Sequence, residues 1–332
     1  MGNRFWRTWP VVVGAILIST FAYVQGRRAP ERATVSGQAS SYAGGRFALL
    51  MDGEVMGFLK SVSGGIVRTD PATHDLGPRR TLRRNAKLLA IKPVAIDVGM
   101  GMSEAFYEWI EMAFDGEFAR RTGQIHAVDF DMQSKSVREF RDARIVEVTF
   151  PELDGSSKDP AYMTVKLAPE KMISGPGTGQ TIKGEGADRR KQWLCSNFRI
   201  EVGDFPCDLV SKIDSFTWKQ AVTKDEVGQF REPALHPTKV EIPNIKLTIS
   251  TADSASWQAW FDQAMKLGAN PQAFDGVITF LAPDMKTALA RVALSGLTPF
   301  VYEVVSTANQ AELASFTVEL RCEGMAFTRL AE

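Results

Sequence analysis

The chain has 332 residues, 44% hydrophobic and 23% charged, so it is long enough for two domains with their own cores and has the composition of a globular protein. Basic and acidic residues both total 39, and a formal net charge of zero gives no electrostatic reason to predict nucleic-acid binding. The three cysteines are too few and too widely spaced for a disulfide framework or a CxxC zinc site, so we interpret them as small apolar residues: Cys195, Cys207 and Cys322.

The N-terminus has a membrane-directed pattern. Residues 9–24 carry no charge and lie between Arg4 and Arg7 on one side and a cluster of arginines that starts at Arg27 on the other. This run is slightly short for a spanning helix, which needs about 20 apolar residues. We therefore predict an apolar helix within residues 1–27 that acts as a signal or membrane anchor. The absence of a clear cleavage site favours the anchor, and a buried helix or a mis-assigned start is the alternative.

The segment that follows, residues 28–45, is small, polar and glycine-containing, which predicts a flexible tether. Beyond it the chain repeats itself. Phe47 and Trp109 recur as Phe198 and Trp260 at a constant shift of 151 residues. We predict two tandem domains, residues 46–172 and 197–329.

Each repeat contains one predicted helix with an apolar stripe. In the first, Ser103 is a candidate N-cap and Gly116 a candidate terminator. In the second, Asp253 or Ser254 is the candidate cap and Gly268 the terminator. The tryptophans lie in the middle of the stripes, which favours core packing over a ligand site. The expected core anchors are Phe106, Trp109, Ile110, Trp257, Trp260 and Phe261.

Around the helices the pattern has period 2. Residues 162–167 and 315–320 alternate apolar and polar side chains, as half-buried strands do. Further strands are predicted at 46–51 and 145–150 and at their counterparts in the second repeat, 197–202 and 300–305. The predicted fold class is mainly β (α+β): two antiparallel barrels or sandwiches of six or seven strands, each with one short packed helix.

This order of elements resembles the tail-tube proteins of contractile phages and the related tube protein of type VI secretion, the haemolysin-coregulated protein. The residues that carry the resemblance are Asp52, Gly53, Phe58, Gly64 and the helix with Trp109. In the second copy Gly203-Asp204 replaces the Asp-Gly turn, and no glycine matches Gly64. The resemblance implies a β-barrel subunit that forms hexameric rings stacked into a hollow tube.

In such a subunit a long excursion between early strands contacts neighbouring rings. Here the resemblance places it at residues 69–92, and a solvated loop or edge strand is an equal alternative. Its basic end, residues 78–92, holds no acid, whereas the counterpart at 217–243 mixes both signs, a difference that would order copy one against copy two. The inter-subunit candidates are Arg79, Arg80, Arg83, Arg84, Lys87, Arg231 and Glu232.

Between the repeats, residues 173–196 are predicted to be a glycine-rich linker. Its GPGTGQT stretch has Gln180 where a phosphate-binding loop needs lysine, and no strand-to-helix context surrounds it, so we do not interpret it as a nucleotide site. His74, His126 and His236 have no metal-ligand spacing, and no GxSxG motif is present. We predict neither enzymatic activity nor a cofactor or metal.

Two functions remain open at this stage. The first is a structural subunit in which one chain supplies two domains, so that three chains close a pseudo-sixfold ring. The second is a secreted or anchored binding protein that reuses the barrel without polymerising. The expected partners are further copies of the chain, sheath or baseplate proteins, and a membrane through residues 9–24. The expected location is a membrane, the exterior of the cell, or a virion or tail-like particle.

Overall fold

A computed structural model describes residues 46–75, 82–183, 193–225, 234–266, 271–305 and 314–330, and the side chains of 69–75, 82–90, 253 and 305 are not described. The predicted N-terminal apolar helix and tether (1–45) lie outside these residues. In the described part the chain is mainly β with two α-helices, as predicted, and it also has one 3₁₀ turn. Every strand pair in that part is antiparallel.

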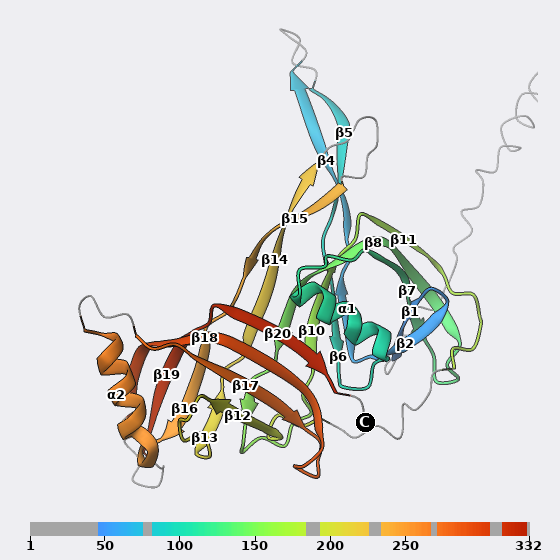
Figure 1. Ribbon diagram of the computed structural model, residues 1–332. Coiled ribbons are helices and arrows are strands. Elements are labelled where there is room, and N and C mark those ends of the chain that lie inside the picture. The colour runs from blue at the N-terminus through green and yellow to red at the C-terminus, as the bar shows by residue number, and fades with distance from the viewer. Residues whose placement is uncertain are drawn as a thin grey trace, which may run out of the picture. The chain divides into compact units, whose positions relative to one another are not determined.

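The first half of the chain supplies eleven described strands and one helix, and its main sheet curls nearly into a barrel (Figure 1). In this sheet the order is β2-β1-β7-β8-β10-β6-β3, and β11 also pairs with β8. The elements are β1 (Arg46–Met51), β2 (Glu54–Leu59), β3 (Ser61–Gly64), β4 (Val67–Asp75), β5 (Leu82–Ile91), β6 (Val94–Val98), α1 (Glu104–Phe114), β7 (Arg121–Val128), β8 (Ser134–Phe150), β9 (Leu153–Asp154), β10 (Met163–Ala168) and β11 (Lys171–Pro176).

The second half forms another sheet, in the order β12-β17-β18-β19-β16-β13-β9, with β20 beside β18. Its last strand, β9, comes from the first half. The elements are β12 (Phe198–Val202), β13 (Val210–Ile213), β14 (Phe216–Asp225), β15 (Ala234–Glu241), β16 (Ile245–Ser250), η1 (Thr251–Asp253), α2 (Ser254–Ala264), β17 (Phe274–Leu281), β18 (Ala288–Val305), β19 (Ser315–Arg321) and β20 (Gly324–Arg329).

Two long strands organise these sheets. The first part of β8 pairs with β7 and β11, and its last residues pair with β10 and β14. Similarly, β18 pairs with β17 and β20 over its first part and with β19 over its last part. Each long strand therefore passes from one layer of strands to another, and a β-bulge lies where it does so, opposite Lys166/Leu167 in β8 and at Pro299/Val301 in β18.

The strands form where the sequence alternates. In β10 and β16 every second side chain is buried, as the period of 2 predicts. The buried positions join the helices in one continuous core that extends through both halves of the chain. A small separate cluster forms around Ala48, Val128 and Ile182.

One expectation about an irregular segment needs correction. The predicted linker, 173–196, begins inside β11, whose backbone pairs with β8 from Lys171 to Pro176, so the first residues of that segment belong to a sheet. Its described end is ordered too, because Trp193 is buried against Phe280 with ring centroids 4.8 Å apart. In the excursion placed at 69–92, the described residues up to Ile91 belong to β4 and β5, which pair only with each other in the described part of the chain.

Candidate assembly surfaces

The helices hold the predicted core anchors. Phe106, Trp109 and Ile110 of α1 are at most 1% exposed, and Trp257 and Trp260 of α2 are also buried. Phe261 is only half-buried and lies with its ring centroid 5.8 Å from that of Tyr302 in β18. Figure 1 shows α1 beside β20 and α2 beside β18.

Both central tryptophans make the same kind of hydrogen bond. The Nε1 of Trp109 donates to the carbonyl of Ala119 at 3.0 Å, and that of Trp260 donates to the carbonyl of Gln272 at 2.9 Å. A buried indole that donates to the following loop has no free polar edge for a ligand, so these side chains tie each helix to the loop after it.

The first helix begins differently from the sequence expectation. Ser103 occupies the N-cap position, but its hydroxyl makes no capping bond and contacts the sulfur of Met56 at 3.2 Å. At the other end Gly116 adopts a positive φ of 82°, as a helix terminator does. In the second half a 3₁₀ turn ending at Asp253 leads directly into α2, and Gly268 lies outside the described residues.

The inter-subunit candidates have one described location. Arg83, Arg84 and Lys87 belong to β5, the second strand of the β4–β5 hairpin, and of their side chains nothing is described. The other candidates fall outside the described residues: Arg79, Arg80, Arg231 and Glu232.

An unexpected contact joins the two halves of the chain, and we call it the internal junction. Strand β14 pairs antiparallel with the end of β8, so that Phe216 lies opposite Phe150 and Trp218 opposite Val148. The hydroxyls of Thr149 and Thr217 approach to 3.0 Å across the pair. Strand β9 pairs in the same way with β13. A strand from each half therefore extends a sheet of the other.

Aromatic rings fill the internal junction. Phe150 stacks on Phe216 with centroids 4.8 Å apart, and Phe114 at the end of α1 stacks on Trp218 at 4.7 Å. Phe327 of β20 lies 5.9 Å from Phe150. All but Phe114 are buried. Aromatic pairs of this kind contribute about 0.5–1.5 kcal/mol each beyond their buried area, so the junction has the character of a core.

A polar contact closes the junction at its edge. The backbone N–H of Arg329 donates to the carboxylate of Glu111 at 2.5 Å. Its guanidinium donates to the carbonyls of Leu289 and Met100, and it lies 5.3 Å from the ring centroid of Tyr107. The C-terminal strand is thereby bound to α1 of the first half.

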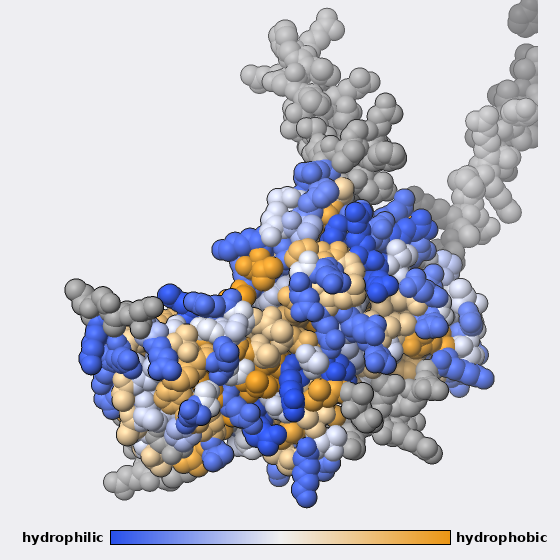
Figure 2. Space-filling view, viewed as in Figure 1, coloured by the Kyte–Doolittle hydropathy of each residue, from blue (hydrophilic) through white to orange (hydrophobic). Residues whose placement is uncertain are grey.

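Several strand edges have no partner among the described residues, and two of them belong to β18 and β4. The last part of β18, residues 298–305, pairs with β19 on one side only. The start of β4 pairs only with β5. Apolar side chains are exposed along both edges: Val301 at 36%, Val304 at 59%, Ile66 at 51% and Val67 at 44%. Figure 2 shows hydrophobic and hydrophilic residues interspersed over the visible face.

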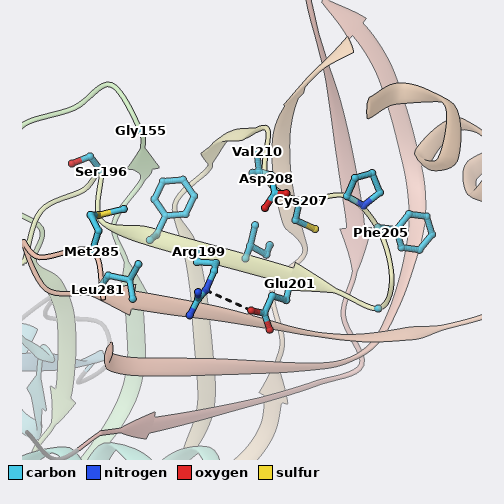
Figure 3. Close-up of a pocket in the computed structure, with 14 residues that line it drawn as sticks. Gly155, Ser196, Arg199, Glu201, Phe205, Cys207, Asp208, Val210, Leu281 and Met285 are labelled. Atoms are coloured by element: carbon cyan, nitrogen blue, oxygen red, sulfur yellow. Dashed lines mark ion pairs between the residues drawn. The ribbon is translucent and has the colours of Figure 1, made fainter. Parts of the chain in front are cut away.

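A groove lies along the outer edge of β12 (Figure 3) and has a volume of about 460 Å³. This edge is unpaired among the described residues, whereas β2 covers the edge of β1 in the first half. Arg199 and Glu201 form an exposed ion pair of 3.5 Å at the groove, and Cys207 and Asp208 lie across from them. No histidine is among the described residues that line the groove.

Two of the histidines singled out in the sequence have described polar partners. His126 is buried, with Nδ1 2.8 Å from the hydroxyl of Ser134 and Nε2 3.0 Å from Gln124, and burial lowers its pKa. His236 lies 3.5 Å from Asp225, and the side chain of His74 is not described. Burial raises the pKa of Cys322 and of Cys195, which makes both thiols poor nucleophiles at neutral pH.

Together these features define a β-structured protein with open sheet edges on its surface and an internal junction between the two halves of the chain. Residues 44–173 match the family model of the T4-like virus tail tube protein gp19. This part of the chain is therefore similar to the tail tube proteins of that family, as the sequence resemblance indicated. No curated protein matches the chain.

Solved structures that match part of the chain come from contractile injection machines and their relatives. A chain of the anti-feeding prophage baseplate is 15% identical with a TM-score of 0.34, over 41% of this chain and 93% of its own. A chain of the PVC sheath-tube complex, an extracellular contractile injection system, is 15% identical with a TM-score of 0.34, over 40% and 89%. Hcp1 from Flavobacterium johnsoniae is 12% identical with a TM-score of 0.26, over 39% and 93%.

Within the described ranges, no helix is long and apolar enough to cross a membrane. The predicted membrane contact through residues 9–24 lies outside those ranges.

Proposed function

We propose that the chain is a structural, self-assembling subunit of a tail-tube-like particle and that residues 46–172 and 197–329 are two tandem tail-tube-like domains. The family match at residues 44–173 supports this for the first domain. For the second, the support is the order of its elements: an opening strand, a hairpin, a strand, a short helix and a long bent strand, as in the first.

Strand register supports the duplication more strongly than element order does. Val148 of β8 lies opposite Val165 of β10, which lies opposite Ile96 of β6. In the second half Tyr302 lies opposite Val318, which lies opposite Leu247. In both halves the β-bulge lies at the equivalent place, between the second and third residue pairs counted from these central pairs. Because a one-residue slip would invert every side chain, agreement of register and bulge together favours a common ancestor fold.

The observation that carries the proposed function is the internal junction. One chain already contains a tight contact in which β14 of the second domain extends the sheet of the first. A repeat of this head-to-tail contact between chains would generate a closed ring or a filament. By the resemblance to hexameric tube proteins, we propose a ring of three chains with pseudo-sixfold symmetry.

A structural role agrees with the chemistry of the described residues. The acidic residues near strand ends bind lysines, as Glu147 does with Lys166 at 2.6 Å and Glu152 with Lys212 at 2.8 Å. The buried histidine is enclosed by hydrogen-bond partners. We propose that the protein is not an enzyme and that its partners are further copies of itself, together with sheath or baseplate proteins of the same particle.

Negative-stain electron microscopy and light-scattering mass of the full-length protein test this function. We expect rings whose mass corresponds to three chains, and stacked rings at high concentration. A particle that remains a single chain at every concentration would contradict the proposal.

The alternative, a binding protein that reuses the fold without polymerising, is favoured by the groove along β12. An unpaired strand edge beside a groove can accept an extended peptide as an added strand. The same mass measurement separates the two functions, because the alternative requires a single-chain particle.

A further inference from the structure

We infer that β4 of one copy pairs antiparallel with the last part of β18 of a second copy, with Ile66 opposite Glu303 and Val67 opposite Tyr302. This inference rests on the proposed function and adds the contact by which one chain binds the next. The partner is a second copy because the internal junction shows the same contact between equivalent elements within one chain.

The register follows from the strand pairings. Tyr302 is the equivalent of Val148. Val148 lies opposite Val165 of β10, and Tyr302 lies opposite Val318 of β19, which is the equivalent strand. In the neighbouring hairpins, Val62 lies opposite Ile96 as Ile213 lies opposite Leu247. Counting five residues on from Val62 and from Ile213 makes Val67 the equivalent of Trp218. Trp218 lies opposite Val148, so Val67 is placed opposite Tyr302.

Apolar side chains are exposed at the positions that this register would bury between two copies. The internal junction buries Phe150 and Trp218. The residues equivalent to them are Val304, which is 59% exposed, and Val67, which is 44% exposed. At the end of α2, Met265 is 51% exposed at the position that corresponds to Phe114, the ring that stacks on Trp218. Contact between two copies would cover these three side chains together, removing apolar surface from water at about 25 cal/mol per Å².

Charges agree with the same register. Arg68 and Glu303 are both exposed, and the register makes them diagonal neighbours on one face of the new strand pair. In the internal junction Lys219 lies directly opposite Glu147, whereas the equivalent of Glu147 is Val301, so between copies the acidic partner of Arg68 is the diagonal neighbour Glu303. One difference between the two contacts is that Gly65 takes the place of Phe216, so the contact between copies lacks the Phe150–Phe216 stack. We therefore expect it to be weaker than the internal junction.

Disulfide cross-linking of the full-length protein tests the register. Ile66→Cys combined with Glu303→Cys places two cysteines directly opposite each other on exposed positions, at a Cα separation of about 4.5–5.5 Å, which a disulfide can span. The matched internal control is Thr149→Cys with Thr217→Cys, whose bond forms within one chain. The matched negative control is Ile66→Cys with Val304→Cys, because Val304 faces the other side of the strand. Wild type shows the background from native thiols.

After mild oxidation we expect the Ile66→Cys/Glu303→Cys protein to shift from one-chain to two- and three-chain bands on denaturing gels. The internal control should remain at one chain. If this protein forms rings by electron microscopy but does not cross-link, the inferred contact is wrong while the proposed function stands. If it neither cross-links nor assembles, both fail. A ladder that extends beyond three chains supports the strand pairing and overturns the three-chain ring.

A charge exchange provides an independent test that does not depend on oxidation. Arg68→Glu and Glu303→Arg should each reduce the mass of the assembly at a fixed concentration, because each places like charges on neighbouring strands. The double variant should restore it. Equal assembly by all three variants would overturn the contact.

Discussion

The ring of Phe114, the residue at the end of α1, stacks on the indole of Trp218 in β14, with centroids 4.7 Å apart and planes inclined by 28°. These residues belong to different halves of the chain. Because Trp218 is only 1% exposed, the contact between the two halves is part of the hydrophobic core.

Trp218→Ala should therefore destabilise the whole protein by about 3–5 kcal/mol, since it leaves a large cavity in the internal junction. Chemical denaturation followed by circular dichroism measures the loss. The control is Phe130→Ala, whose side chain is 86% exposed and whose replacement should change stability by less than about 0.5 kcal/mol. A similar small loss for both variants would mean that the junction is not tightly packed.

Gly64 is expected to tolerate no side chain. Its φ is +79°, and a Cβ at this position would lie 2.1 Å from the carbonyl oxygen of Pro93. Gly64→Ala should lower the free energy of unfolding by about 1–3 kcal/mol or more, because backbone strain and a steric clash combine. Gly175 in β11 is the matched control, since a Cβ added there would have nothing within 4 Å of it. Thermal unfolding of both alanine variants should show a loss only for Gly64→Ala.

Arg329 is expected to matter more than its place near the chain end suggests. Arg329→Met removes its hydrogen bonds to the carbonyls of Met100 and Leu289, so we expect a loss of about 1.5–3 kcal/mol. Arg199→Met is the comparison, because its ion pair with Glu201 is more than half exposed and contributes about 0–1 kcal/mol. Urea denaturation curves compare the two, and equal midpoints would contradict the bridging role of Arg329.

His126 should make stability depend on pH. Burial lowers its pKa in the folded protein below the ordinary histidine value of 6.5, so the unfolded chain binds the proton more tightly. The stabilisation is complete above pH 6.5 and is lost as the pH falls below that value towards the folded-state pKa. The unfolding free energy of His126→Gln, measured between about pH 5 and pH 8, should decrease less on acidification than that of wild type. Parallel curves would show that this histidine does not titrate differently on folding.

Local patterns predicted most single elements of the fold. Alternation located the strands from Met163 and Ser315, and the 3.6-residue stripes located both helices and their tryptophans. These elements are determined by which face of a short segment is buried, and that property is visible within about ten residues.

The contacts between the halves were not predictable in this way. The pairing of β8 with β14 joins residues near 150 to residues near 216, and nothing in either segment specifies its partner. A signal was present in the aromatic residues Phe216 and Trp218, which have Gly65 and Val67 at the equivalent places in the first copy. That asymmetry marks one hairpin as buried and the other as exposed. The second helix was less accurately predicted, because Phe261 is shielded only in part.

The internal junction also bears on the kinetics of growth. A contact within one chain forms at an effective local concentration of the order of millimolar, independent of how dilute the protein is. If six domains close a ring, joining them in pairs halves the number of contacts that must form between chains. The Phe114–Trp218 contact within each pair persists at dilutions where contacts between chains dissociate. The smallest species in solution would then still present one open β4 edge and one open β18 edge, ready to add to either end.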